Sequence, residues 1–504
     1  MSDVENNPRG RLIIVSNRLP IRVLPQADGS WRAKSGTGGL VTALAPILRD
    51  RGGVWIGWPG IAEEDAPEDL REGLKRTSTE LGYRIDPVLL TRQEEREFYA
   101  GFSNEIVWPI FHDLQTLCNF DPRYWDAYQN VNRKFAEAIA EEWGTGDYVW
   151  IHDYHLMTVA RELRRLEIPG KIGFFLHIPF PPLDIFLKIP WRLELLQALL
   201  DYDLVGFQTE RDRRNYVQCV RALVPGVLYK GRGRVVAARL GGREIRTGSF
   251  PISIDAAGFA EAADTREVAE AAWYIHENLP KRKIILGIDR LDYTKGIPYR
   301  LDAYRDALIR YPELHGKISL VQVVVPSRTG VPEYQELQSE IEQLVGAING
   351  QFTRSGWVPI HYIFRTLDRT ELLGYYRACE IALITPLKDG MNLIAKEYCA
   401  SQTHNDGVLI LSEFAGAASQ LQTGAILVNP YHIRQVANAI YTAFKMEEYE
   451  RKSRMRRLRQ AVRRQDVFWW VDSVLKAAIS KDLEDFPVLE EYMPRVRAAS
   501  FLKE

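Results

Sequence analysis

Two cationic side chains, Arg290 and Lys295, directly follow a short apolar run at residues 284–288. Cations at the end of a strand suit a diphosphate leaving group, because they stabilise the negative charge that grows as it departs. A surface ion pair with Asp289 or Asp292 is the alternative interpretation of the same residues. The spacing therefore indicates a candidate site for an anion at the end of a strand.

A second motif runs from the end of an apolar run, through a turn, into a helical pattern: Asp389-Gly390-Met391-Asn392-Leu393-Ile394-Ala395-Lys396-Glu397. The N-terminus of such a helix can hold an anion through its backbone N–H groups. Asp389 lies before the helix and Glu397 lies inside it. Arg328 follows the apolar run at 318–325 and adds a third cation in an equivalent position.

Titratable residues follow two apolar runs in the first half of the chain. His152, Asp153 and His155 come after one run, and His177 comes after the next. Histidine exchanges protons near neutral pH, and a carboxylate such as Asp153 can orient a hydroxyl. The alternative is a set of buried structural histidines. We predict no metal, because His152 and His155 lack a third ligand at metal spacing.

Two glycine-rich stretches fail to match known phosphate motifs. Gly36, Gly38 and Gly39 follow the first strand, but Val41 stands where a dinucleotide fingerprint needs its third glycine. These glycines could allow the backbone to approach a phosphate closely, or they could simply form a tight turn. The second stretch runs from Gly226 to Gly231 and continues with Arg and Gly in place of Lys and Ser or Thr, so it is not a P-loop.

An aromatic segment contains Phe98, Tyr99 and Trp108. Carbohydrate sites use apolar ring faces with a few polar groups, although an ordinary core segment has the same composition.

Apolar runs alternate with amphipathic segments along the chain, which predicts a doubly wound α/β architecture with buried parallel strands. The predicted strands are residues 12–16, 54–58, 148–151, 172–177, 204–207, 284–288, 318–325, 360–364, 381–385 and 408–411, and predicted helices include 133–143, 158–165, 211–223 and 334–348. Ligands bind outside the carboxyl ends of such strands, where the candidate residues lie.

A chain of 504 residues is too long for one ordinary core, so we predict two domains. The boundary is placed near residue 252. Residues 1–252 form the first domain, residues 253–465 form the second, and residues 466–504 return to the first as an aromatic helix and an unassigned tail.

Composition excludes several classes of protein. The 65 basic and 66 acidic residues nearly cancel, so neither nucleic acid nor an anionic membrane is an expected partner. The four cysteines form no C-x-x-C pair, and the polar N-terminus has no signal segment. We expect a cytoplasmic protein with buried free thiols.

Together these blocks resemble the retaining glycosyltransferases of family 20, which make trehalose 6-phosphate. The resemblance covers residues 12 to about 475 and is carried by near-verbatim blocks: Val15-Ser16-Asn17-Arg18, Trp150-Ile151-His152-Asp153-Tyr154-His155-Leu156, Phe174 to Pro181, Arg290-Leu291-Asp292-Tyr293-x-Lys295-Gly296, and the motif from Asp389 to Glu397. It implies the GT-B arrangement of two facing Rossmann-like domains, with UDP-glucose as donor substrate, no cofactor and no metal.

The resemblance also implies a role for individual residues. The donor would contact Gly38, Gly39, Arg290, Lys295, Asp389, Gly390, Met391, Asn392, Leu393 and Glu397, and His177 would bind its glucose. The acceptor, glucose 6-phosphate, would contact Arg18, Tyr99, Trp108, Asp153 and Arg328. Arg290, Lys295, Asp153 and His177 would be the catalytic residues.

Some alternatives stay open at this point. One is a relative that uses glycerol 3-phosphate as acceptor, since Asp113 and the segment 114–124 depart from the family pattern. Another is a non-catalytic homologue that senses a sugar phosphate. The nucleotide of the donor (UDP, GDP or ADP) is not fixed by the sequence, and a homo-oligomer is compatible with an enzyme of this size.

Overall fold

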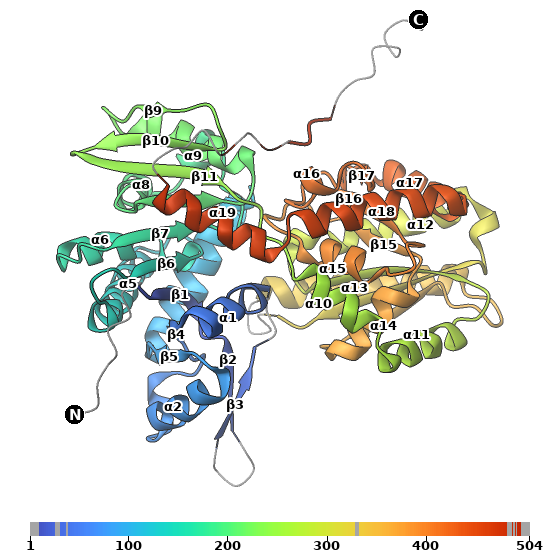
Figure 1. Cartoon of the computed structure of the whole chain (residues 1–504). Coiled ribbons are helices and arrows are strands. Elements are labelled where there is room, and N and C mark those ends of the chain that lie inside the picture. Colours follow the sequence, from blue (N-terminus) through green and yellow to red (C-terminus); the bar gives the residue numbers. More distant parts are fainter. Residues whose placement is uncertain are drawn as a thin grey trace, which may run out of the picture. The chain divides into compact units, whose positions relative to one another are not determined.

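The computed structural model describes residues 10–25, 31–36, 39–327, 332–480, 486, 489 and 491–494. The chain divides into two compact units. The first holds the residues up to Ile252 together with Val467–Leu489, and the second holds Ser253–Asp466 (Figure 1). Residues 491–494, which we expected with the first domain, group with the second unit.

The first unit is built on a mostly parallel sheet. In spatial order its strands are β5 (Arg84–Pro87), β4 (Gly53–Trp58), β1 (Leu12–Arg18), β6 (Tyr148–His152), β7 (Lys171–Phe175), β8 (Leu204–Phe207), β11 (Arg243–Ser249), β10 (Val235–Leu240) and β9 (Tyr229–Lys230). In this order the strands from β5 to β11 run parallel to one another. Strand β10 runs antiparallel to both of its neighbours, β11 and β9. A separate hairpin joins β2 (Ile21–Pro25) to β3 (Trp31–Ser35).

Helices flank this sheet (Figure 1). They are α1 (Gly39–Arg51), α2 (Leu70–Leu81), α3 (Arg92–Glu94), the π-helix η2 (Glu95–Val107), α4 (Trp108–Phe111), α5 (Pro122–Glu142), α6 (Val159–Arg165), α7 (Leu183–Phe186), α8 (Arg192–Leu199) and α9 (Glu210–Leu223). The predicted aromatic C-terminal helix is α19 (Val467–Ile479), and it contacts α1, β8 and β11. Its Trp470 is fully buried against Trp150, with ring centroids 5.1 Å apart.

The second unit has an all-parallel sheet, as the apolar runs predict. Its strands in spatial order are β14 (Ile360–Phe364), β13 (Ile318–Val325), β12 (Lys283–Arg290), β15 (Ile381–Ile384), β16 (Val408–Ser412) and β17 (Ile426–Val428). Successive residues of β12 supply the cores on opposite faces: Ile285 packs into one cluster, and Ile284 and Leu286 pack into the other. Burial on both faces explains why this strand is continuously apolar.

The helices of the second unit cover both faces of its sheet. They are α10 (Ala256–Ala263), α11 (Arg266–Asn278), α12 (Ile297–Arg310), α13 (Pro332–Phe352), α14 (Arg369–Ala378), α15 (Leu393–Ser401), α16 (Ala418–Leu421), α17 (Ile433–Lys445) and α18 (Glu448–Arg464). Within the described ranges, no helix combines the length and the apolar character that a membrane crossing requires.

Candidate active site

In the first unit, the chemically active residues lie at the carboxyl ends of four neighbouring strands, β4, β1, β6 and β7. Arg18 ends β1, Asp153 follows β6, and His177 lies just beyond β7. Parallel strands present these ends at one edge of the sheet, where ligands bind in open α/β folds. The structure therefore gathers residues that are far apart in the sequence.

Arg18 is held by aromatic rings. Its guanidinium carbon lies 3.8 Å from the centroid of Trp58 and 5.3 Å from that of Tyr99. A Cβ on Gly60 would come within 1.8 Å of the guanidinium, so only glycine, with a φ of +89°, fits beside it. Stacking of this kind fixes the plane of the guanidinium.

A wall of further aromatic side chains adjoins this arginine. Tyr99 stacks on His155, with centroids 5.9 Å apart, and Trp108 packs against Tyr154 at 5.8 Å. The amide of Asn104 ties the wall together, because it donates to the carbonyl of Tyr99 at 2.6 Å and accepts from the Tyr154 hydroxyl at 3.0 Å. The π-helix η2 supplies both Tyr99 and Asn104, and π-helical turns are frequent at functional sites.

Asp153 has an unusual backbone. Its φ of +77° lies in a region that residues other than glycine rarely adopt. The backbone N–H of Asp153 donates to the carbonyl of Phe175 at 2.8 Å, and its carboxylate accepts from the backbone N–H of His177 at 3.2 Å. These bonds hold Asp153 beside His177, and strain of this kind concentrates at functional positions.

His177 belongs to a buried hydrogen-bonded chain. Gln208 donates its amide N–H to Nδ1 of His177 at 3.1 Å, and its amide oxygen accepts from the backbone N–H of Ile252 at 2.9 Å. Nε2 of His177 therefore carries the proton, and this N–H donates a hydrogen bond to Nδ1 of His152 at 3.2 Å. Burial lowers the pKa of His177 to about 3, and it lowers the pKa of His152 well below its usual value. Both imidazoles are neutral at physiological pH.

In the second unit, Arg290 and Lys295 flank the carboxyl end of β12. Arg290 is exposed and lies 3.8 Å from Asp292. Lys295 is largely buried, and its ammonium contacts the carboxylate of Asp389 at 2.5 Å. Asp389 follows the neighbouring strand β15, so one of the two predicted cations, Lys295, meets the predicted acidic motif.

A buried ion pair supports this edge of the sheet. Arg300 on α12 is fully buried and contacts Asp289 at 2.6 Å. It also donates to the Thr385 hydroxyl at 3.1 Å and reaches the backbone carbonyl of Lys295 at 3.5 Å. Burial raises the pKa of Asp289, and the positive charges of Arg300 and Lys295 oppose that rise. Asp289, one of the alternative partners of Arg290, is thus engaged with Arg300.

The N-terminus of α15 is capped by its own motif. Asn392, with a φ of +61°, accepts at its side-chain oxygen from the backbone N–H of Ala395 at 3.2 Å. The Asp389 carboxylate accepts from the backbone N–H of Met391 at 3.1 Å and from the Asn392 amide at 3.3 Å. These bonds fix the turn that precedes the helix and point its peptide N–H groups toward the end of the strand.

Glu397 lies one turn into α15 and is half-buried. The hydroxyl of Tyr376 donates to its carboxylate at 2.8 Å. Burial raises the pKa of Glu397, and the hydrogen bond from Tyr376 opposes the rise. A carboxylate with one defined donor and a remaining free oxygen can accept two hydroxyl groups of a ribose.

The structure adds two residues that the sequence analysis did not identify, Trp58 and Gln208. Trp58 ends β4, so the strand-end rule applied to Trp58-Pro59-Gly60 would have found it. Gln208 follows β8 and gave no distinctive signal. Gly39 begins α1, whereas Gly38 and Arg328 lie outside the described residues. Over the described part of the chain, no group of three or more His, Cys, Asp or Glu is arranged to hold a metal ion.

Comparison with known proteins gives the family. The family model "Glycosyltransferase family 20" matches residues 10–480. The trehalose-6-phosphate synthase of Mycolicibacterium gilvum is 41% identical over 501 residues, which cover 97% of each chain.

Solved structures agree with this match. An α,α-trehalose-phosphate synthase from Burkholderia xenovorans, in complex with glucose-6-phosphate, has a TM-score of 0.82 at 34% identity and covers 93% of this chain and 100% of its own. An E. coli structure bound with UDP-2-fluoro glucose has a TM-score of 0.83 at 36% identity and covers 94% of this chain and 100% of its own. The two Rossmann-like units are those of a GT-B enzyme, and the chain belongs to glycosyltransferase family 20.

Proposed function

We propose that this enzyme transfers glucose from UDP-glucose to glucose 6-phosphate and releases α,α-trehalose 6-phosphate and UDP. Relatives that are about 40% identical over nearly the whole chain are trehalose-6-phosphate synthases. Related structures contain glucose-6-phosphate in one case and a fluorinated UDP-glucose in another. Glucose 6-phosphate and an analogue of UDP-glucose are therefore ligands of proteins with similar structures.

The acceptor phosphate is assigned to Arg18 of the first unit. Its guanidinium is fixed between Trp58 and Tyr99, so it can offer two parallel N–H groups to a phosphate without losing much side-chain entropy. This aromatic clamp is the observation that carries the proposal. Trp108 lines the sugar portion, Asp153 orients an acceptor hydroxyl, and Arg328 is proposed as a second phosphate ligand.

The donor is assigned mainly to the second unit. Arg290, Lys295 and the N-terminus of α15 bind the diphosphate, and Glu397 binds the ribose. Asp389 and the backbone from Gly390 to Leu393 bind the glucose. Gly38, Gly39 and His177 are proposed as donor contacts from the first unit. The diphosphate competes with Asp389 for Lys295, so donor binding frees a carboxylate oxygen for the hydroxyls of the glucose.

The chemistry follows from the leaving group. The bond between the anomeric carbon and the diphosphate breaks, and Arg290, Lys295 and the α15 dipole stabilise the charge that develops. The acceptor hydroxyl forms the new bond from the same face, so the configuration is retained, and its proton passes to the departing phosphate. His177 is neutral and acts through its hydrogen bonds, because burial holds its pKa near 3.

The alternative acceptor is glycerol 3-phosphate. The segment with Asp113, just after α4, departs from the family pattern and is the reason for this alternative. Arg18 suits the phosphate of either acceptor, and the relatives favour glucose 6-phosphate. A non-catalytic sensor is disfavoured, because Lys295, Asp389 and Glu397 are all present and hydrogen-bonded.

The test is product formation by purified protein with UDP-glucose, without added metal, and with glucose 6-phosphate and glycerol 3-phosphate as parallel acceptors. We expect trehalose 6-phosphate from the first acceptor alone, with no product from the Arg290→Ala variant. Product from glycerol 3-phosphate alone would overturn the acceptor assignment, and full turnover by Arg290→Ala would overturn the donor site.

The proposal extends to the compartment, the partners and the cofactor requirement of the enzyme. We place the enzyme in the cytoplasm, in keeping with its four free cysteines, which suit a reducing compartment. Its proposed partners are its two substrates and other copies of itself, and it needs no cofactor.

A further inference from the structure

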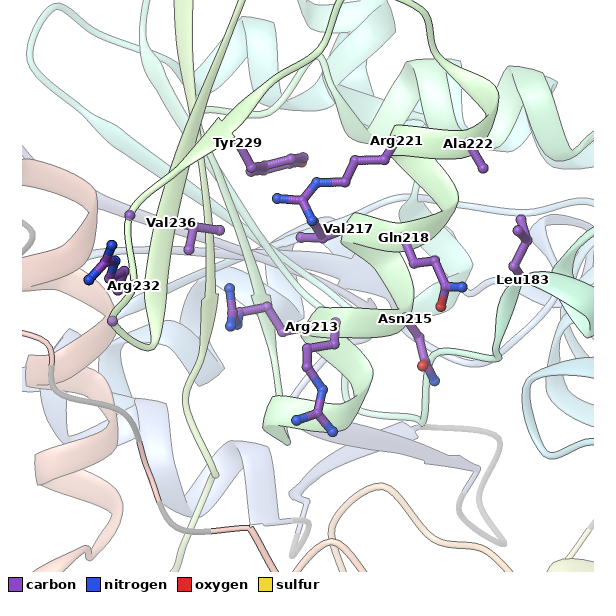
Figure 2. A pocket seen from close by; sticks show the side chains of 13 residues that line it. Leu183, Arg213, Asn215, Val217, Gln218, Arg221, Ala222, Tyr229, Arg232 and Val236 are labelled. Carbon is purple, nitrogen blue, oxygen red and sulfur yellow. The ribbon is translucent and has the colours of Figure 1, made fainter.

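A second pocket lies in the first unit, between α9 and the turn that joins β9 to β10 (Figure 2). Its volume is about 700 Å³, which falls within the roughly 300–1,000 Å³ of small-molecule sites. None of the described residues assigned above to the donor or the acceptor lines it. Its lining is rich in one residue type: Arg213, Arg214, Arg221 and Arg232.

No acidic residue accompanies these arginines in the lining. Arg213 is nine-tenths buried and forms an ion pair with Glu210, whose carboxylate also accepts from the Ser249 hydroxyl at 2.9 Å. The nearby Asp212 accepts from the backbone N–H of Phe180 at 3.0 Å. The carboxylate of Glu210 therefore offsets the charge of Arg213.

Arg221 and Arg232 carry the argument for an anion. Both are exposed, and within the described part of the chain neither forms an ion pair. Figure 2 shows Arg221 reaching from α9 toward Tyr229, while Arg232 lies on the turn across the pocket. Maintaining unpaired arginines in one concavity raises the local potential and favours a bound anion.

Backbone geometry on the turn suits close approach by a phosphate. Gly231 and Gly233 flank Arg232 and line the pocket with it. Gly231 has a φ of +111°, which a residue with a side chain rarely adopts. This is the glycine-rich stretch that resembles a P-loop in spacing but lacks its lysine. The structure places it in an arginine-lined pocket instead.

One wall of the pocket is apolar and can hold the body of a ligand. Val217, Val236, Leu183 and the ring of Tyr229 form it. The Tyr229 hydroxyl accepts from Thr247 at 3.3 Å, which fixes the ring. Burial raises the pKa of Tyr229, and the positive charges of Arg221 and Arg213 oppose the rise, as expected for cations that point toward it.

From the convergence of these arginines on a half-apolar pocket, we infer that this pocket is a second anion site, distinct from the proposed active site, that binds a phosphorylated small molecule. Arg221 and Arg232 contact the phosphate through bidentate N–H groups, and the apolar wall contacts the rest of the ligand. A phosphorylated sugar and a nucleoside diphosphate share this chemistry.

Calorimetric titration of the full-length protein tests the site. Inorganic pyrophosphate, fructose 6-phosphate and ADP are titrated separately into the wild type and into the Arg18→Gln/Lys295→Gln variant, in which the proposed active site has lost phosphate contacts. We expect one additional site per chain for pyrophosphate and for at least one of the organic ligands. The organic ligand that binds more tightly identifies the source of the phosphate.

A pair of variants locates the binding. In Arg221→Gln/Arg232→Gln we expect the Kd of the additional site to rise at least tenfold. Lys230→Gln/Arg239→Gln removes the same charge from exposed positions of β9 and β10 outside the lining, and we expect a change of less than twofold. Both variants should retain the transfer activity and the melting temperature of the wild type.

Two results would overturn the inference. One is the absence of any binding site for these ligands in the Arg18→Gln/Lys295→Gln variant. The other is equal weakening of binding in the two double variants, which would indicate a general charge effect. Because the readout is binding and not turnover, failure here is distinguishable from failure of the proposed function.

Discussion

At the scale of single residues, Gln208 determines what His177 can do. Its amide donates to Nδ1 of His177 and thereby leaves the proton on Nε2. The oxygen of the same amide accepts a hydrogen bond from the backbone N–H of Ile252, the last residue before the second unit begins. A glutamine in this position selects the tautomer of His177 that donates Nε2–H to His152, and we propose that the 6-hydroxyl of the donor glucose replaces His152 as the acceptor of this N–H.

Replacing Gln208 should therefore affect recognition of that hydroxyl. In Gln208→Leu we expect kcat/KM with UDP-glucose to fall about 10- to 100-fold, since an orphaned buried polar group costs about 1–3 kcal/mol. UDP-xylose lacks the 6-hydroxyl, so kcat/KM with this donor should change less than threefold. Steady-state kinetics with both donors measures the difference, and an equal loss with the two would indicate a merely structural role for Gln208.

The same histidines predict how stability depends on pH. Burial lowers the pKa of both His177 and His152 below the unfolded value of about 6.5. Between pH 6.5 and pH 3 the unfolded chain thus binds more protons, so the free energy of unfolding falls as the pH falls. Each histidine contributes a slope of about 1.4 kcal/mol per pH unit.

Urea unfolding at several pH values checks this slope. In His152→Gln we expect the slope of the free energy of unfolding against pH to be smaller between pH 6.5 and 5. The decrease should correspond to about one proton, or about 1.4 kcal/mol per pH unit. Above pH 7 the variant and the wild type should share one slope. Identical slopes in the acidic range would mean that His152 is protonated in the folded protein.

At the scale of elements, the strands were predictable because they are buried on both faces. The apolar run at residues 318–325 coincides with β13, and the run at 408–411 lies within β16. The carboxyl ends of such strands then located Arg18, Asp153 and Lys295 without any knowledge of the tertiary structure. Binding geometry that depends on packing, such as the stacking of Arg18 on Trp58, could not be obtained this way.

The elements that were missed are exposed or irregular. Strands β10 and β11 form a hairpin through Gly241-Gly242, both with positive φ, and carry polar residues such as Arg239 and Glu244. Their pattern is not that of a buried parallel strand, although the Gly-Gly pair is a hairpin signal. The π-helix η2 has no sequence signature, because its wider turn arises from packing and not from propensity.

The C-terminal helix α19 is an element whose contribution can be measured. Trp470 is fully buried and packs against Phe175 at 5.1 Å as well as against Trp150. In Trp470→Ala we expect the first unit to lose about 3–5 kcal/mol of unfolding free energy. Phe468, on the same helix, is 45% exposed and serves as the matched control. Phe468→Ala should cost less than about 1 kcal/mol, and similar losses in both would contradict this packing.

At the scale of the whole molecule, each unit carries its own set of ligand groups. Arg18 with its aromatic clamp belongs to the first unit, and Lys295, Asp389 and Glu397 belong to the second. Each set is held by contacts within its own unit, such as the stacking of Arg18 on Trp58 and the hydrogen bond from Tyr376 to Glu397. The proposed acceptor and donor sites should therefore respond separately to mutation.

Binding of each substrate alone tests that separation. In Arg18→Gln we expect the Kd for glucose 6-phosphate to rise about 10- to 100-fold, because a charge-assisted hydrogen bond contributes about 1.5–3 kcal/mol, while the Kd for UDP stays within twofold. In Lys295→Gln we expect the Kd for UDP to rise about 10- to 100-fold, while the Kd for glucose 6-phosphate stays within twofold. Calorimetry with the two ligands gives all four changes. If either variant weakened both ligands equally, the assignment of Arg18 to the acceptor and of Lys295 to the donor would be wrong, because a residue that contacts one ligand alone cannot alter both binary affinities alike without disturbing the fold.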